Sequence, residues 1–154
     1  MHILYFHQHF TTPQGSGGIR SYEFSRYLIK QGYEVTIVCG SFANGDTNLT
    51  GDFKKGIRKG IVDGINIIEL DLPYSNNLGF LSRSIIFIQY SLRSIKLIFQ
   101  LKYDLLLASS TPLTVAIPGI ISRIFINKPF IFEVRDLWPE LPISMGVIRN
   151  PLII

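Results

Sequence analysis

Three glycines gather between the first apolar run of the sequence and the first helical pattern, at Gly15, Gly17 and Gly18. Backbone N–H groups of such a loop can approach an anion closely, and the N-terminus of the following helix adds a partial positive charge. The spacing excludes a dinucleotide fingerprint, because Arg20 stands where G-x-G-x-x-G requires a glycine. We therefore expect the loop to bind substrate, with a flexible turn as the alternative.

A second group of residues that could bind a ligand lies at the end of the last predicted strand, over 130–135, and just after it. Arg135 can hold a phosphate or carboxylate through two hydrogen bonds. Asp136 and Glu140 can accept hydrogen bonds from sugar hydroxyls, and Trp138 offers an apolar face to a ring. Ligands of open α/β sheets bind at the carboxyl ends of strands, so we expect these residues, with Glu133 before them, to contact substrate. The alternative is an Arg–Asp pair that ties the strand end to a loop, with Trp138 in the core.

Histidines and hydroxyls mark the ends of two other predicted strands. His7 and His9 lie two residues apart, and two histidines without a third ligand make a poor zinc site, so no metal is expected. We expect His7 and His9 instead to line the substrate site at the end of the first strand. Ser110 and Thr111 are expected either to donate hydroxyls to a ligand or to cap the next helix.

The elements that must position these residues alternate between strand and helix patterns. Asp63-Gly64 between two β-prone runs predicts a hairpin over 57–71, and the polar, Gly- and Asn-rich stretch 41–56 before it is expected to be a mobile loop. The alternation predicts a doubly wound, mainly parallel Rossmann-like α/β sheet with a β-hairpin insertion. The expected strands cover 2–7, 34–39, 103–108 and 130–135, and the expected helices cover 19–31, 78–102 and 114–125.

The helical pattern over 78–102 is both cationic and unusually apolar. It carries Arg83, Arg93 and Lys96 and contains no acidic residue. A cationic amphipathic helix with a wide apolar surface suits an anionic bilayer, so these basic side chains are candidate membrane contacts. The alternative is a crossover helix that is buried on both sides. The apolar stripe comprises Leu81, Ile85, Ile88, Leu92, Ile95 and Phe99.

Composition limits the class of protein. The chain has 154 residues, of which 47% are hydrophobic and 17% charged, and this excludes intrinsic disorder and fits one domain. The net charge of +4 suits anionic partners but is too small to indicate nucleic acid.

Cys39 has no partner for an internal disulfide, which indicates a reducing compartment. The N-terminus lacks a signal-peptide pattern and no apolar run is long enough to span a bilayer, so we expect a cytoplasmic protein.

Several segments together resemble the N-terminal half of bacterial family 4 glycosyltransferases of the GT-B fold. The matching segments are MHILYFHQHF, PQGSGGIRSYEFSRYLIKQGYEVTIVC, VDGINIIELDLPYSNN, LLASSTPLTVAIPG and, most specifically, FIFEVRDLWPE. They cover nearly the whole chain in the family's order. Within the family, the sequence is similar to the fucosamine-transferase-like enzymes that make surface polysaccharide, such as capsule, O-antigen or exopolysaccharide.

The resemblance implies that residues 1–154 are the acceptor-binding domain of an enzyme with two Rossmann-like domains. The nucleotide-sugar would be bound mainly by a C-terminal domain that this chain lacks, so the fragment is expected to be inactive alone. Transfer would proceed with retention and without an obligatory metal or other cofactor. The implied catalytic residues are Asp136, expected at the acceptor, and Arg135, where many members of the family have histidine.

The resemblance also implies partners. Acceptors in this subgroup are often saccharides linked to polyprenyl diphosphate, which places the expected enzyme peripherally on the inner face of the plasma membrane. The basic helix over 78–102 suits such an acceptor. Two other functions remain open: a non-catalytic binding module for a phosphorylated or lipid-linked sugar, and an oxidoreductase on a Rossmann-like scaffold, which the failed glycine fingerprint disfavours.

Overall fold

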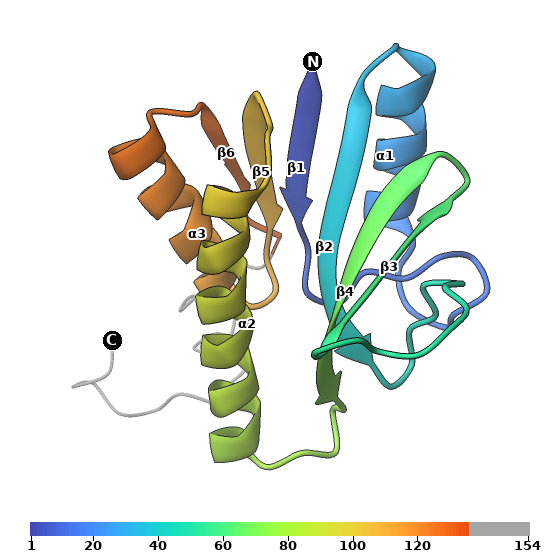
Figure 1. The fold of residues 1–154 in the computed structure, drawn as a ribbon. Coiled ribbons are helices and arrows are strands. Elements are labelled where there is room, and N and C mark those ends of the chain that lie inside the picture. The colour runs from blue at the N-terminus through green and yellow to red at the C-terminus, as the bar shows by residue number, and fades with distance from the viewer. Residues whose placement is uncertain (136–154) are drawn as a thin grey trace.

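Six strands form a single sheet in the computed structural model, which describes residues 1–135 of the chain (Figure 1). The strands lie in the order β3-β4-β2-β1-β5-β6, and all neighbours are parallel except β3 and β4. This architecture confirms the predicted doubly wound, mainly parallel α/β fold. The strands are β1 (His2–Phe6), β2 (Glu34–Phe42), β3 (Ile57–Val62), β4 (Ile65–Tyr74), β5 (Leu105–Ser109) and β6 (Phe130–Glu133).

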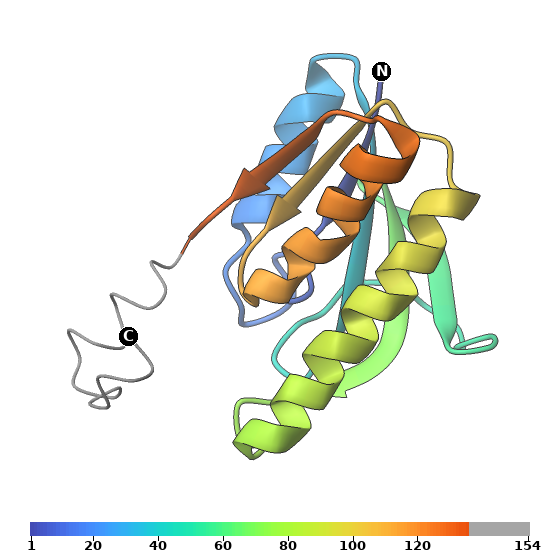
Figure 2. The same cartoon turned by 90° about the vertical axis from the view of Figure 1, so that its left-hand side faces the viewer.

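Helices cover both faces of the sheet. The first, α1 (Arg20–Lys30), packs on one face, whereas α2 (Phe80–Gln100) and α3 (Ala116–Ile121) lie side by side on the other (Figure 2). A short 3₁₀ turn (Leu113–Val115) leads into α3, and a π-helical turn (Ser122–Ile126) continues it. Pro118, which could have bent this segment, falls in the first turn of α3, where its missing N–H is not needed.

The central strands are buried on both faces, as a parallel sheet requires. In β1, Leu4 and Phe6 join the core beneath α2 and α3, while Ile3 and Tyr5 join the core beneath α1. Because successive side chains of a strand point to opposite faces of the sheet, β1 contributes residues to two separate hydrophobic cores. The strand order reverses at β1, between β2 and β5, and this switch point is where ligands bind in folds of this kind.

The predicted hairpin forms, and it belongs to the main sheet. Asp63 and Gly64 both have positive φ, 51° and 84°, as the tight turn between two twisted strands requires. The second hairpin strand, β4, runs parallel to β2, with pairs from Thr36↔Asn66 to Phe42↔Tyr74. The first, β3, is the antiparallel edge strand of the sheet.

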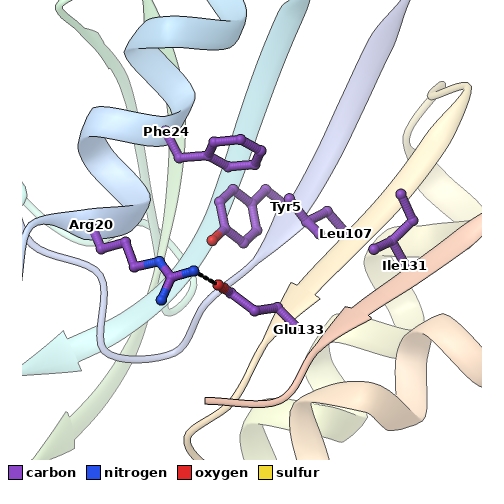
Figure 3. A pocket seen from close by; sticks show the side chains of 6 residues that line it. All are labelled: Tyr5, Arg20, Phe24, Leu107, Ile131 and Glu133. Carbon is purple, nitrogen blue, oxygen red and sulfur yellow. Dashed lines mark ion pairs between the residues drawn. The ribbon is translucent and has the colours of Figure 1, made fainter.

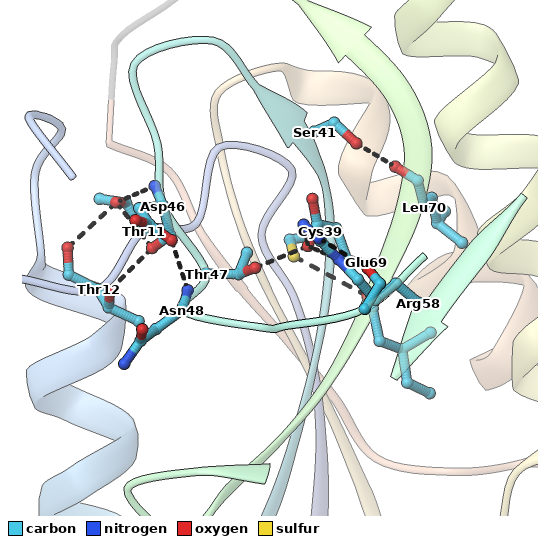
Figure 4. Close-up of polar contacts among 12 residues, drawn as sticks. Thr11, Thr12, Cys39, Ser41, Asp46, Thr47, Asn48, Arg58, Glu69 and Leu70 are labelled. Atoms are coloured by element: carbon cyan, nitrogen blue, oxygen red, sulfur yellow. Dashed lines mark hydrogen bonds and ion pairs between the residues drawn. The ribbon is translucent and has the colours of Figure 1, made fainter. Parts of the chain in front are cut away.

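The segment between β2 and β3 is tied down by hydrogen bonds (Figure 4). The Asp46 N–H donates to Thr11 Oγ1 at 2.9 Å, and the Thr12 N–H donates to the Asp46 carbonyl at 2.8 Å. Thr47 Oγ1 donates to the buried carboxylate of Glu69 at 2.7 Å. These bonds anchor the segment, which was expected to be a mobile loop, to the loop after β1 and to β4.

Candidate functional site

A polar hollow of about 230 Å³ opens at the carboxyl edge of the sheet, beside the switch point at β1. Its walls come from the ends of β1 and β2, the loop before α1, and the segments that follow β5 and β6. Segments far apart in sequence meet here because parallel strands bring all their carboxyl ends to one edge. The lining residues are His7, His9, Gly17, Gly18, Phe42, Thr111 and Arg135.

The three predicted glycines have different surroundings. Gly17 and Gly18 line the hollow, and a Cβ added at Gly18 would meet no atom within 4 Å. A Cβ at Gly15 would lie 2.1 Å from Thr11 Oγ1 and 2.6 Å from the Asp46 nitrogen, so Gly15 is a packing residue of the loop. Of the three glycines expected to contact substrate, Gly17 and Gly18 thus line the hollow and Gly15 does not.

His7 connects the glycine-loop side of the hollow to Arg135. Its Nδ1 lies 2.7 Å from Ser21 Oγ on α1, and its Nε2 lies 3.5 Å from Arg135 Nη1. A guanidinium can only donate, so His7 Nε2 accepts from Arg135 and the Nδ1–H donates to Ser21. Burial, followed by the nearby positive charge of Arg135, lowers the pKa of His7 to about 3. The imidazole is neutral at pH 7, and its bond to Arg135 orients the guanidinium.

His9 lies on the other side of the hollow, among aromatic rings. Its ring centroid is 4.4 Å from that of Tyr74 and 5.2 Å from that of Phe42, and Phe87 of α2 lies farther off at 6.2 Å. Burial lowers the pKa of His9 to about 4. Its buried Nε2 has no protein hydrogen-bond partner, so this nitrogen can serve a ligand. The placement agrees with the expected role of His9 as a lining residue.

Ser110 and Thr111, although adjacent in sequence, lie in different environments. Ser110 is buried, and its Oγ accepts the backbone N–H of Arg135 at 2.8 Å. It therefore fixes the chain after β6, a role that differs from both a ligand contact and a helix cap. Thr111 is exposed and lines the polar hollow.

Glu133 faces a second, more apolar hollow of about 450 Å³ (Figure 3). Its carboxylate pairs with Arg20 of α1 and accepts the Ser109 hydroxyl, whose oxygen lies 2.7 Å from the Tyr5 hydroxyl. The other walls are Tyr5, Phe24, Leu107 and Ile131, on the face of the sheet that carries α1. Glu133 thus bridges α1 and β6 and does not line the polar hollow that contains Arg135.

The remaining predicted residues lie elsewhere. Asp136, Trp138 and Glu140 fall outside the described residues. The basic residues predicted to contact a membrane are all on α2. The Arg93 guanidinium donates to the Gly56 and Asp71 carbonyls at 3.5 and 3.3 Å, so it points toward the hairpin.

Sequence reasoning missed Phe42 and Ser21, and it placed His7 at the site without its contact to Arg135. Phe42 was missed because the second strand was expected to end at Cys39, whereas β2 continues three residues further. Extending that strand pattern would have placed Phe42 at the ligand edge. No local signal could join His7 to Arg135, since 128 positions separate them.

The arrangement is suited to an anionic ligand. A guanidinium and the backbone of the loop before α1 line the hollow, and within residues 1–135 no carboxylate lines it. In that part of the chain, no group of three or more His, Cys, Asp or Glu side chains is placed to hold a metal ion. The neutral histidines contribute hydrogen bonds without adding charge at pH 7.

Known proteins resemble this chain in structure but do not match it significantly in sequence. No protein-family model matches the chain, and no curated protein matches it significantly. The C-terminal domain of PF1911 hydrogenase from Pyrococcus furiosus superimposes with a TM-score of 0.59 at 12% identity, covering 86% of this chain and 90% of that one. The calicheamicin glycosyltransferase CalG4 superimposes with a TM-score of 0.52 at 15% identity, covering 99% of this chain and 38% of that one.

A second glycosyltransferase match comes from Escherichia coli. The trehalose-6-phosphate structure bound with UDP-2-fluoro glucose has a TM-score of 0.51 at 10% identity, with 86% of this chain and 32% of that one covered. The chain thus spans about a third of the length of these glycosyltransferases. At such identities the likeness concerns the fold alone. The described domain has the mixed α/β fold of one half of a GT-B glycosyltransferase, a fold that the hydrogenase domain also resembles.

Proposed function

We propose that this chain is the acceptor-side half of a retaining glycosyltransferase, which moves a sugar from a nucleotide-sugar to a saccharide acceptor. The observation that carries the proposal is the polar hollow at the switch point, where Arg135 and the glycine loop before α1 converge without a lining carboxylate among residues 1–135. Its fold is that of half a GT-B glycosyltransferase. The sequence segments that resemble family 4 enzymes include the same loop and the same strand end.

The hollow's chemistry fits the leaving group of such a reaction. When the acceptor hydroxyl attacks the anomeric carbon, the bond from that carbon to the diphosphate breaks and negative charge develops on the diphosphate. Backbone N–H groups at Gly17 and Gly18, together with the Arg135 guanidinium, would stabilise this charge. The departing phosphate can take the proton of the attacking hydroxyl, so no separate base is required. Asp136, next in the chain, would contact the acceptor.

The biological setting belongs to the same proposal. We infer a lipid-linked acceptor, such as a polyprenyl-diphosphate sugar, and a role in capsule, O-antigen or exopolysaccharide synthesis at the inner face of the plasma membrane. The support is the resemblance of the sequence to the fucosamine-transferase-like subgroup, together with the basic, apolar α2. The donor would be bound mainly by a C-terminal domain outside this chain.

Transfer can be tested in the full-length protein with a panel of nucleotide-sugars and a bacterial lipid extract. Mass spectrometry of the lipids detects the transferred sugar, and NMR of the new linkage reports retention. Arg135→Ala should lower turnover roughly 100-fold, because it removes a charged group at the developing negative charge. The matched control is Arg26→Ala, whose guanidinium pairs with Asp63 away from the hollow and whose loss should leave turnover nearly unchanged.

Two outcomes would overturn the assignment. Full turnover by the Arg135 variant would place the chemistry away from this hollow. Binding of sugar phosphates without transfer to any lipid would instead support a non-catalytic binding module.

A further inference from the structure

Part of the sheet is uncovered on the face that carries α1. Within residues 1–135, α1 is the only helix on this face, because α2 and α3 both pack on the other one (Figure 1). The more apolar hollow, of about 450 Å³, opens between α1 and the strands β5 and β6 (Figure 3). Its volume is that of a site for a small molecule.

Apolar side chains form most of the wall of this hollow. Phe24 is 44% exposed and Ile131 is 52% exposed, although both line the hollow. The rings of Tyr5 and Phe24 meet edge to face, with their centroids 6.4 Å apart and their planes at 89°. Leu107 and Ile131 lie across from this aromatic pair (Figure 3). A flat apolar ligand would therefore bury exposed apolar surface against aromatic rings on one side and aliphatic side chains on the other.

The hydroxyl protons at the polar end of the hollow are already used. Ser109 donates to Glu133, because the carboxylate paired with Arg20 can only accept. Since Ser109 has one proton, its Oγ must accept from the Tyr5 hydroxyl, which lies 2.7 Å away. Burial raises the pKa of Tyr5, so the phenol keeps this proton at neutral pH. The Tyr5 oxygen can then only accept a hydrogen bond from a ligand, and Glu133 can also only accept.

The charges at this end cancel each other. Arg20 pairs with Glu133, and no other charged side chain of the described residues lines the hollow. A charged ligand would therefore find no free opposite charge, in contrast to the polar hollow, where Arg135 stands without a lining carboxylate among residues 1–135. A saccharide also fits poorly, because several of its hydroxyls would be buried against apolar walls without partners.

We propose that this hollow is a second binding site, which takes an uncharged aromatic ring that carries one hydroxyl, that is, a phenol. The ring would pack between Phe24 and Ile131, and its hydroxyl would donate to the acceptor oxygens at the polar end. The site is independent of the proposed glycosyl transfer, because it shares no lining residue with the polar hollow.

Equilibrium dialysis of the full-length protein with 2-naphthol, a phenol that is uncharged at neutral pH, tests the proposal without any nucleotide-sugar. The protein should bind 2-naphthol roughly fivefold more tightly than 2-methoxynaphthalene, which has the same rings but no proton to donate. The anion 2-naphthoate and methyl glucoside should bind at least as weakly as the methoxy compound. Equal affinity for 2-naphthol and 2-methoxynaphthalene would overturn the hydroxyl's role, and no binding of 2-naphthol would overturn the site.

Two variants remove the walls of the hollow or fill it. Phe24→Ala should lower the affinity for 2-naphthol roughly fivefold, because one ring of the wall is lost, and Ile131→Trp should block the hollow. Tyr27→Ala and Ile61→Trp are the matched controls, since both residues are exposed, at 58% and 71%, and neither lines the hollow. Both controls should bind 2-naphthol like the unchanged protein, and circular dichroism checks the fold of every variant. Unchanged binding by both Phe24→Ala and Ile131→Trp would place the ligand elsewhere.

Tyr5→Phe tests the polar end separately from the walls. Phenylalanine keeps the ring but removes the accepting oxygen, so the preference for 2-naphthol over 2-methoxynaphthalene should fall. Because Tyr5 is buried, the walls are tested independently by Phe24 and Ile131, whose side chains are partly exposed. A full preference in a folded Tyr5→Phe protein would show that the Tyr5 oxygen does not receive the hydroxyl.

Discussion

At the scale of single residues, the candidate site has one charged group, the Arg135 guanidinium, among residues 1–135. The groups around it, such as the His7 imidazole, are uncharged at neutral pH. His7 is 2% exposed, and its neutral ring accepts a hydrogen bond from Arg135 while donating to Ser21. The ring therefore sets the position of the guanidinium without repelling it. Gly18 leaves the remaining wall of the hollow open, because it has no side chain.

Replacing Gly18 by valine should block the hollow without disturbing the fold. A Cβ at this position meets no atom within 4 Å, so the new side chain would occupy the space proposed for the diphosphate. Steady-state kinetics of the full-length enzyme should show turnover reduced roughly 10- to 100-fold. Gly79→Val is the control, since a Cβ there also meets nothing within 4 Å and Gly79 does not line the hollow. Equal turnover of both variants would argue against a substrate role for the loop.

The two buried histidines should make stability fall in weak acid. Their pKa values are lowered from 6.5 to about 3 for His7 and about 4 for His9. Below about pH 6.5 the unfolded chain therefore binds protons at these histidines that the folded chain does not bind. The free energy of unfolding should then drop by up to about 1.4 kcal/mol per pH unit for each histidine. Urea unfolding between about pH 7 and pH 5 measures this slope.

His7→Asn separates the contribution of one histidine from that of the other. Asparagine can still donate to Ser21 but does not titrate, so the slope between about pH 6 and pH 5 should be roughly halved. An unchanged slope would mean that His7 gains its proton in the folded protein as readily as in the unfolded chain.

At the scale of elements, close approach between helix and strand determines how β6 is held. A Cβ at Gly119 of α3 would lie 2.1 to 2.4 Å from ring atoms of Phe130, the first residue of β6. Only glycine allows this contact.

Gly119→Ala should therefore destabilise the domain even though alanine favours helices. Pushing α3 away from Phe130 should lower the free energy of unfolding by about 2 kcal/mol, a typical cost of overpacking. Gly79→Ala, at the N-cap of α2 with open space around it, should change it by less than about 1 kcal/mol. Thermal or urea unfolding of the two variants provides the comparison, and equal stability would show that Phe130 can move aside.

The orientation of α2 is a second result at this scale. Serines at positions 91 and 94 face inward, and such small side chains let the helix approach its neighbours closely; the Ser91 hydroxyl donates to the Thr114 carbonyl at 2.8 Å. Tyr90 is buried beside them and donates to the Val38 carbonyl at 2.6 Å. The inward face thus combines two serines with Tyr90, Leu97 and Ile98, and a second apolar stripe remains outside.

At the scale of the whole molecule, the fold separates two surfaces. The polar hollow opens at the carboxyl edge of the sheet, and the exposed apolar side chains of α2 belong to the helix layer on one of its faces.

The order and type of the elements, and the edge of the sheet at which the candidate site lies, could be predicted from local sequence patterns. Local periodicity identifies β1, α1 and the hairpin, and the rule that carboxyl ends of parallel strands share an edge brings Gly17, Gly18 and Arg135 together. Three features appear only in the folded structure: the contact between His7 and Arg135, the ion pair between Glu133 and Arg20, and the outward orientation of the α2 stripe. The physical reason is that periodicity shows which residues share a face, whereas the choice between two apolar faces depends on the shape and hydrogen bonds of distant partners.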